Sequence, residues 1–227
     1  MLPGMNWGLW IILAGIPLLF GLWAQLRVKS TFNKYSEVRP RNGMSGAEAA
    51  AAVLRSSGLD GLSIKPIDGH LTDHYNPRDR TLNLSADVGQ ASSIAAMGVA
   101  AHEAGHAVQD ANRYWPMRFR QTLVPAAQIG SSLWFFPVIL GFIFASTGLI
   151  TIGLVLFAAI VLFQLVTLPV EFDASRRALV ALQGQGLLAE EEVPGARQVL
   201  NAAALTYVAA FVAALGQLLY LFVASRN

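Results

Sequence analysis

Long stretches without a charged residue alternate with charged segments along the chain. The first runs from 7 to 26, and its twenty residues can cross a bilayer core of roughly 30 Å as a helix. The longest, 121–170, has fifty residues and would extend about 75 Å as one helix. We therefore expect it to form two antiparallel spans, at 123–145 and 149–170. A fourth span is expected at 202–223.

The charged segments predict a small domain after the first span. Within residues 27–122, Ser45–Glu48 forms a capping box that starts an alanine-rich helix. The short stretches 71–75 and 81–85 flank a proline-containing turn, which predicts a β-hairpin. A second polar segment, 171–200, is expected to begin with a helix and to connect the third and fourth spans. The pattern therefore predicts a mostly α membrane protein with four transmembrane helices and a small α+β domain.

The stretch 91–109 predicts a helix that is difficult to assign from hydrophobicity alone. Only fifteen uncharged residues separate Asp87 from Glu103, and many of them are alanine, serine or glycine. This is short and weakly apolar for a membrane span, so we favour a buried helix of a soluble domain. The alternative is a helix inside the bilayer.

The composition supports the membrane assignment and narrows the chemistry. Hydrophobic residues make up 54% of the chain and charged residues 13%, against the usual quarter charged. There is no cysteine, so disulfides, thiolate nucleophiles and cysteine-containing zinc sites are excluded. The sequence pI is about 9.2, but the formal net charge is only +2, which gives nucleic-acid binding little support.

The distribution of basic residues predicts the orientation of the spans. Lys and Arg are concentrated in the segments 27–122 and 171–200, and only Arg226 lies on the other side of the predicted membrane. Cytoplasmic loops carry the excess of basic residues. We therefore expect both termini outside and the domain in the cytoplasm.

The sequence HEAGH at residues 102–106 carries the most specific chemistry. On a helix, His102 and His106 lie one turn apart on the same face and can bind one metal ion. Glu103 lies beside them, where a carboxylate can take a proton from a metal-activated water. The spacing predicts a metallopeptidase motif, although a helix that merely carries two surface histidines would have the same pattern.

Glu171 is the first charged residue after the fifty-residue uncharged stretch. The predicted hairpin of spans returns the chain to the side that carries HEAGH, so this carboxylate can supply a third metal ligand. The alternative is an ion pair with Arg176 or Arg177.

Three segments together resemble a known family. They are HEAGH, DHYNPRDRTLNLS at 73–85 and LPVEFDASRRA at 168–178. With 73–85 upstream of HEAGH and 168–178 downstream, they resemble the bacterial YugP-like membrane zinc metallopeptidases, over essentially the whole chain. The resemblance implies a zincin-like catalytic domain in the bacterial inner (plasma) membrane. The family is similar in its motifs to membrane-anchored gluzincins such as the CAAX-processing and HtpX-like proteases. In those proteases a glutamate of an E-x-x-x-D motif, after a transmembrane hairpin, completes H-E-x-x-H.

The resemblance implies a role for each residue of the site. One Zn²⁺ per chain would be bound by His102, His106 and Glu171, with Glu103 as the general base. In those gluzincins an aspartate follows the third ligand by four residues, but this chain has Ser175 there. A carboxylate that orients a histidine must then come from elsewhere. Asp173 is the nearest candidate in sequence.

Two further assignments concern the substrate. His74 or Tyr75 is a candidate donor to the oxyanion that forms on the peptide carbonyl. The predicted strand 81–85 either presents an open edge to an extended peptide or serves only as scaffold. His70 and His74 are also four residues apart, but in a hairpin this spacing does not predict a second metal site.

We therefore predict a membrane-anchored zinc metalloendopeptidase, with Glu103 as the base. One alternative is a site-2-type intramembrane protease, and another is a catalytically silent membrane scaffold that keeps zinc for stability. The expected partners are the lipid bilayer and a peptide or membrane-protein substrate, with no nucleic acid. The sequence leaves the oligomeric state open, a homo-oligomer included.

Overall fold

The computed structural model describes residues 7–226, which divide into two compact units. The first unit contains the described residues up to 25, together with 116–169 and the residues from 206 onward. The second unit contains 26–115 and 170–205. Each unit thus combines segments that lie far apart in the sequence.

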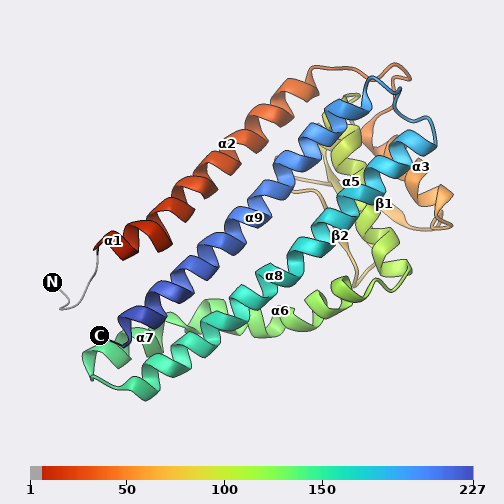
Figure 1. Ribbon diagram of the computed structural model, residues 1–227. Helices are drawn as coiled ribbons and strands as arrows, with labels where there is room; N and C mark the ends of the chain where they lie inside the picture. The colour runs from red at the N-terminus through yellow and green to blue at the C-terminus, as the bar shows by residue number, and fades with distance from the viewer. Residues whose placement is uncertain (1–6, 227) are drawn as a thin grey trace. The chain divides into compact units, whose positions relative to one another are not determined.

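Four helical segments are long and apolar enough to cross a membrane by length and composition, in agreement with the predicted number. They are Gly8–Ser36, Trp115–Ile143, Thr147–Gly184 and Val193–Ala224. Figure 1 shows the helices that form them, which are α1 (Trp7–Trp10), the π-helix η1 (Ile11–Gly15), α2 (Ile16–Ser36), α6 (Trp115–Leu133), α7 (Phe135–Ile143), α8 (Thr147–Gly184) and α9 (Val193–Ala224). α8 joins the span predicted at 149–170 and the helix predicted from 171 into one continuous helix, which carries Glu171.

In the first unit, two glycines allow the hairpin formed by α6, α7 and α8 to pack closely. A Cβ atom at Gly130 would lie 2.5 Å from the Leu156 carbonyl oxygen, and one at Gly153 would lie 2.9 Å from the Trp134 carbonyl oxygen. Small residues permit such approaches between membrane helices. The rings of Trp134 and Phe157 also meet edge to face, 4.7 Å apart.

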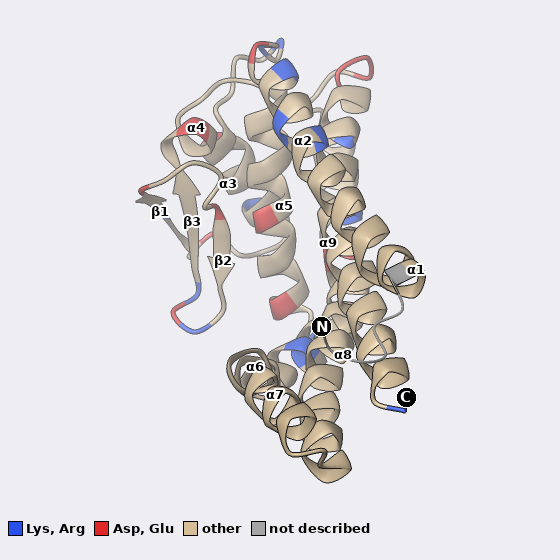
Figure 2. Ribbon diagram, turned by 90° about the vertical axis from the view of Figure 1, so that its left-hand side faces the viewer, with Lys and Arg blue, Asp and Glu red and all other residues tan. Residues whose placement is uncertain are grey.

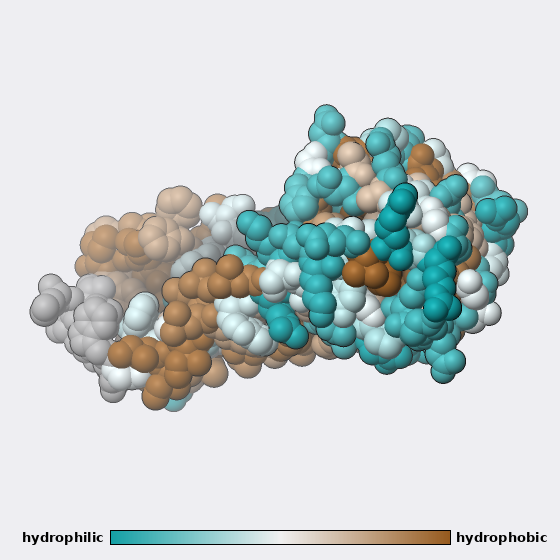
Figure 3. All heavy atoms as spheres, turned by 90° about the horizontal axis from the view of Figure 1, so that it is seen from above, coloured by the Kyte–Doolittle hydropathy of each residue, from teal (hydrophilic) through white to brown (hydrophobic). Residues whose placement is uncertain are grey.

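The first unit exposes apolar side chains and carries few charges. Large exposed fractions are found at Ile12, Leu19 and Ile143, which are 59%, 66% and 68% exposed. Figure 3 shows hydrophobic side chains at the surface of this unit, and Figure 2 shows α7 and the first part of α8 without a charged residue. Such a surface is suited to lipid contact rather than to water.

The second unit contains a small mixed sheet and several short helices. Their bounds are α3 (Gly46–Ser56), β1 (Ser63–Ile67), β2 (His74–Asn76), β3 (Thr81–Ser85), α4 (Ala86–Gly89) and α5 (Ile94–Ala111). The predicted capping box at the start of α3 is confirmed, because Ser45 and Glu48 each accept a hydrogen bond from the other's backbone N–H. The predicted hairpin is confirmed as the antiparallel pair of β2 and β3.

The order of the strands corrects one prediction. The sheet has the order β1-β3-β2, with β1 parallel and β2 antiparallel to β3. Residues 81–85 therefore form the central strand, which is paired with β1 along its length and with β2 at 81–83. The suggestion that this strand offers an open edge to a peptide is wrong. β1 and β2 are the edge strands.

Helix α5 forms the centre of the second unit. It begins after Ser93, whose side chain accepts a hydrogen bond from the Ala96 backbone N–H at 3.1 Å. Its residues contact α3, α4, β2 and β3. Another face lies against α9, where a Cβ atom at Gly98 would be 3.7 Å from Ala196. Most of its side chains are buried, as expected of a helix in a domain core.

Candidate metal centre

Two histidines one turn apart on α5 form the first half of the centre. The ring centroids of His102 and His106 are 4.8 Å apart, and the residues are only 9% and 8% exposed. The helical spacing predicted from the sequence thus brings both imidazoles to one place. They lie at a buried face of α5 rather than on its exposed surface, which excludes the interpretation as two surface histidines.

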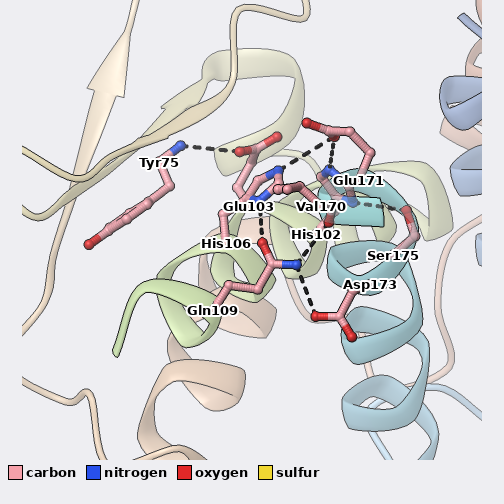
Figure 4. A network of polar contacts seen from close by, with 9 residues as sticks. All are labelled: Tyr75, His102, Glu103, His106, Gln109, Val170, Glu171, Asp173 and Ser175. Carbon is pink, nitrogen blue, oxygen red and sulfur yellow. Dashed lines mark hydrogen bonds and ion pairs between the residues drawn. The ribbon is translucent and has the colours of Figure 1, made fainter. Parts of the chain in front are cut away.

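Glu171 of α8 completes the cluster. Its Oε2 lies 3.2 Å from His102 Nε2 and 3.5 Å from His106 Nε2. One ligand atom from each of the three residues lies within 4.8 Å of the other two. Figure 4 shows the carboxylate directed toward both rings. Glu171 is 2% exposed, so its charge needs such partners.

The glycine of HEAGH allows α8 to approach. A Cβ atom at Gly105 would lie 2.8 Å from the Ala174 carbonyl oxygen, and Ala174 is fully buried. Gly105 lies between the two histidines in sequence, and Ala174 follows Glu171 by three residues. This close approach therefore brings the third candidate ligand to the first two.

The other nitrogen of each ring has a partner of its own. His102 Nδ1 lies 3.1 Å from Ser175 Oγ, and His106 Nδ1 lies 3.0 Å from Gln109 Oε1. Both Nε2 atoms are thereby directed toward Glu171. Ligating histidines commonly hold their second nitrogen in this way. Two imidazoles and a carboxylate form a ligand set typical of catalytic zinc, so these residues fit the ion that the motif implies.

Glu103 lies beside the ligand pair and is held by the sheet. Its Oε2 accepts a hydrogen bond of 3.1 Å from the backbone N–H of Tyr75 in β2. Desolvation by burial raises the pKa of the Glu103 carboxyl above its usual value, although the neighbouring histidines oppose this shift. The residue predicted as the base thus has an environment that favours proton uptake.

The side chains of His74 and Tyr75 have partners outside the three-residue cluster. The Tyr75 hydroxyl donates to Asp110 Oδ2 at 2.9 Å, and burial together with this contact raises the pKa of Tyr75 to about 12. His74 Nδ1 lies 2.9 Å from the Thr72 carbonyl oxygen, and Asn83 Nδ2 lies 3.3 Å from His74 Nε2. The group of Tyr75 that contacts Glu103 is its backbone amide.

Asp173 is connected to His106 only through Gln109, a residue that was not identified from the sequence. Gln109 Nε2 donates to Asp173 Oδ2 at 2.9 Å, while Gln109 Oε1 faces His106. Arg176 and Arg177 also donate to Asp173, at 2.6 and 2.5 Å. The arginines considered as alternative partners of Glu171 are therefore paired with Asp173. The available signal for Gln109 was a polar residue three positions after His106 on a helix, where side chains share a face.

Comparisons with known proteins agree with this chemistry. Residues 10–226 match the model of a family described as "Putative neutral zinc metallopeptidase". The chain is 42% identical over 211 residues to "Putative membrane protease YugP" of Bacillus subtilis (strain 168). The aligned region covers 93% of this chain and 94% of that protein. No solved structure gives a significant match.

Proposed function

The chain belongs to the family described as "Putative neutral zinc metallopeptidase", and we propose that it is a membrane-anchored zinc endopeptidase. The observation that carries this proposal is the cluster of His102, His106 and Glu171, whose ligand atoms lie within 4.8 Å of one another. A glutamate beside such a cluster, at the second position of H-E-x-x-H, is the feature that separates a hydrolase from a purely structural site.

The three ligands would hold one zinc ion. Bound there, zinc would supply Lewis-acid chemistry and lower the pKa of water from its bulk value toward about 7. His102 and His106 would bind through Nε2, since their Nδ1 atoms face Ser175 and Gln109. Glu171 would add the negative charge that two neutral imidazoles lack.

Glu103 would act as the general base. Its Oε2 accepts the backbone N–H of Tyr75, which orients the carboxylate while Oε1 can take a proton. The raised pKa brings the carboxyl closer to the pH at which it must both accept and release a proton. Glu103 would then transfer that proton to the amine that leaves the cleaved peptide. We keep His74 and Tyr75 as candidate oxyanion donors, with the contacts described above.

The substrate would be an extended peptide segment. β2 is an edge strand, and it is also the strand whose backbone contacts Glu103. An extended chain can add to such an edge through main-chain hydrogen bonds to groups other than the Tyr75 N–H, which already donates to Glu103. Such bonds make binding largely independent of sequence. A membrane-protein segment that is unfolded near the bilayer has the required conformation.

The proposed location is the cytoplasmic side of the membrane. The four long apolar helices and the name of the Bacillus subtilis relative support a membrane protein. The excess of Lys and Arg in 27–122 and 171–200 supports a cytoplasmic second unit with both termini outside. The packing of α5 against α3 and the sheet favours a helix within a domain over the intramembrane alternative.

Glu103→Gln tests the proposal directly. We expect purified full-length protein in detergent to cleave fluorescently labelled casein, and Glu103→Gln to lose at least about 100-fold in rate, as expected when a general base is removed. The variant should still bind zinc, because Glu103 is not among the proposed ligands. Glu190→Gln, a change at an exposed glutamate, is the matched control.

The outcome separates the two classes of function. A catalytically silent scaffold would keep its zinc and show the same cellular phenotype with either variant. Equal cleavage rates for the wild-type protein and Glu103→Gln would overturn the proposed role of Glu103. Loss of zinc from Glu103→Gln would instead show that this carboxylate binds the metal.

A further inference from the structure

Gln109 is a buried amide whose hydrogen-bonding groups all have partners. The residue is 0% exposed. Its Nε2 donates to the Val170 carbonyl oxygen at 2.8 Å and to Asp173 Oδ2 at 2.9 Å. Its Oε1 lies 3.0 Å from His106 Nδ1. Figure 4 shows this amide between α5, which carries His106, and α8, which carries Glu171.

These contacts fix the orientation of the amide. The Val170 carbonyl and the Asp173 carboxylate are both acceptors, so the two hydrogens of Nε2 must face them. A flipped amide would place Oε1 against two acceptors and leave their lone pairs without a donor. The remaining group, Oε1, can only accept, and the atom it faces is His106 Nδ1.

The orientation of Gln109 in turn selects one tautomer of His106. Because Oε1 accepts, Nδ1 of the neutral imidazole must carry the proton, and Nε2 must carry the lone pair. Nε2 is the nitrogen that lies 3.5 Å from Glu171 Oε2. A carboxylate only accepts, so in the absence of a metal this contact favours a proton on Nε2 as well, and a bound cation would take the place of that proton. The same amide therefore holds the imidazole ready to bind a cation through Nε2.

His102 lacks this selection. Its Nδ1 faces Ser175 Oγ at 3.1 Å, and a hydroxyl can either donate or accept. Ser175 can therefore steady the His102 ring without choosing which nitrogen carries the proton. The surroundings of His106 therefore select its tautomer, whereas those of His102 do not.

The amide also joins the two helices of the centre. Val170 directly precedes Glu171, so its bond with Gln109 connects α5 to α8 at the third ligand. Asp173 is in turn held by Arg177, whose Nε lies 2.5 Å from Oδ2. A polar connection thus runs from an arginine on α8 through Asp173 and Gln109 to a proposed metal ligand.

We infer that Gln109 is a positioning residue of the metal centre, which fixes the tautomer of His106 and the place of Glu171 relative to it. This inference rests on the zinc site of the proposed function, but it concerns metal binding and not hydrolysis. Outer partners of metal-binding histidines typically contribute about 10–100-fold in metal affinity. Gln109 is uncharged, and the negative charge nearest to it in this connection is on its hydrogen-bond partner Asp173.

The first test compares Gln109→Met with Gln185→Met in the purified full-length protein. Methionine keeps the length of the side chain and removes all three hydrogen bonds, while Gln185 is exposed. We expect Gln109→Met to weaken Zn²⁺ binding about 10–100-fold, measured against a chelating dye, and Gln185→Met to change it less than about 2-fold. Ser175→Ala should have a smaller effect than Gln109→Met.

The second test reads the tautomer, which a purely structural role would not change. The chain has four histidines, so their ring nitrogens can be resolved in a long-range ¹H–¹⁵N spectrum of the zinc-free protein. Because the Glu171 carboxylate beside Nε2 favours the doubly protonated ring, the spectrum is recorded at an alkaline pH at which the imidazole is neutral. We expect the neutral His106 to be protonated at Nδ1 in the wild-type protein and to become a mixture of tautomers in Gln109→Met. A His106 spectrum that is unchanged in the variant would overturn the inference.

A rescue variant covers the case in which Gln109→Met does not fold. Gln109→Glu keeps an acceptor for His106 but places a carboxylate against Asp173, so it should lose zinc affinity. When Gln109→Glu is combined with Asp173→Asn, the amide introduced at position 173 can donate to the carboxylate introduced at position 109, and part of the affinity should return. The absence of any recovery, with both proteins folded by circular dichroism, would contradict the proposed connection through Asp173.

These outcomes are separable from a failure of the proposed function. If Gln109→Met keeps full zinc affinity while Glu103→Gln abolishes cleavage, the positioning role is wrong and the peptidase stands. If no peptide is cleaved but Gln109→Met weakens zinc binding, the positioning role stands for a centre that is not hydrolytic.

Discussion

Gly105 and Ala174 are so close that a β-carbon at position 105 would lie 2.8 Å from the Ala174 carbonyl oxygen. One residue is in the motif that carries the histidines, and the other is on the helix that carries Glu171. The contact is between two backbones, so neither can yield by changing a rotamer. The geometry of the candidate centre therefore depends on the absence of a side chain.

Gly105→Ala should separate α5 from α8 and weaken the site. We expect a loss of about 1–3 kcal/mol in the free energy of unfolding, as found for overpacked cores, together with weaker zinc binding. Denaturant unfolding and a zinc titration measure the two effects. Gly184→Ala is the control, because a β-carbon there meets nothing within 4 Å and alanine favours a helix. Equal stability of the two variants would show that α8 can adjust its position.

Glu171→Gln tests the third ligand with almost no change in volume. The side chain is 2% exposed and contacts both imidazoles, so the variant keeps the packing while it removes the charge. We expect zinc affinity to fall further than the roughly 10–100-fold loss associated with an outer hydrogen-bond partner. Added zinc should raise the melting temperature of the wild-type protein but not of the variant.

The control for this prediction is Glu190→Gln, at an exposed position of the same connection. It should bind zinc as the wild-type protein does. A chelator should lower the melting temperature of wild-type protein and Glu190→Gln alike, and should leave Glu171→Gln unchanged. Full zinc occupancy of Glu171→Gln, measured by elemental analysis, would remove this residue from the ligand set.

The ionisation of Glu103 can be followed through its partner in β2. Burial raises the pKa of this carboxyl, so in zinc-free protein it should become protonated at a higher pH than the ordinary value of 4.5. As the pH falls through that raised pKa, the hydrogen bond from the Tyr75 amide to Oε2 weakens. The chemical shift of this amide should therefore titrate with a midpoint above pH 4.5.

Two comparisons make this titration specific. Glu103→Gln should abolish the change in the Tyr75 amide shift, because no carboxylate remains to be protonated. Addition of zinc should move the midpoint to lower pH, since a nearby cation favours the ionised form. A midpoint at or below pH 4.5 in the zinc-free protein would contradict the effect of burial.

The elements that could be predicted from the sequence are those set by local pattern and chain length. Fifty uncharged residues are too many for one span, which predicted a hairpin, and Glu171 at its end lies beside His102 and His106. The 3.6-residue period of the helix placed His102 beside His106. These inferences needed no knowledge of which surfaces pack together.

The features that could not be predicted depend on contacts between distant segments. The proline-containing turn before 81–85 predicts a strand but not its place in a sheet, because β3 is central only through its pairing with β1. Asp173 reaches His106 through Gln109, whose role depends on the approach of α8. Ser175 was given no role from the sequence, yet its hydroxyl oxygen lies 3.1 Å from His102 Nδ1.

The proposed topology predicts which sites along the chain are reached from the cytoplasm. Because the natural chain has no cysteine, a single introduced cysteine reports its own position. In Ser92→Cys and Asn112→Cys, the cysteines flank α5 on its two sides in sequence, and Ser146→Cys places one in the turn before α8. Intact cells are treated with a membrane-impermeant maleimide, and inverted vesicles are treated in parallel.

If α5 is a helix of a cytoplasmic domain, cysteines at positions 92 and 112 should both react only in inverted vesicles, and a cysteine at position 146 only in intact cells. A site-2-type arrangement would place the ends of α5 on opposite sides, so one of these two positions would react in each preparation. The cysteine-free protein gives the background. Labelling of both α5 positions in intact cells would reverse the assigned orientation, and the basic residues of 27–122 would then lie outside, against the rule from which the orientation was derived.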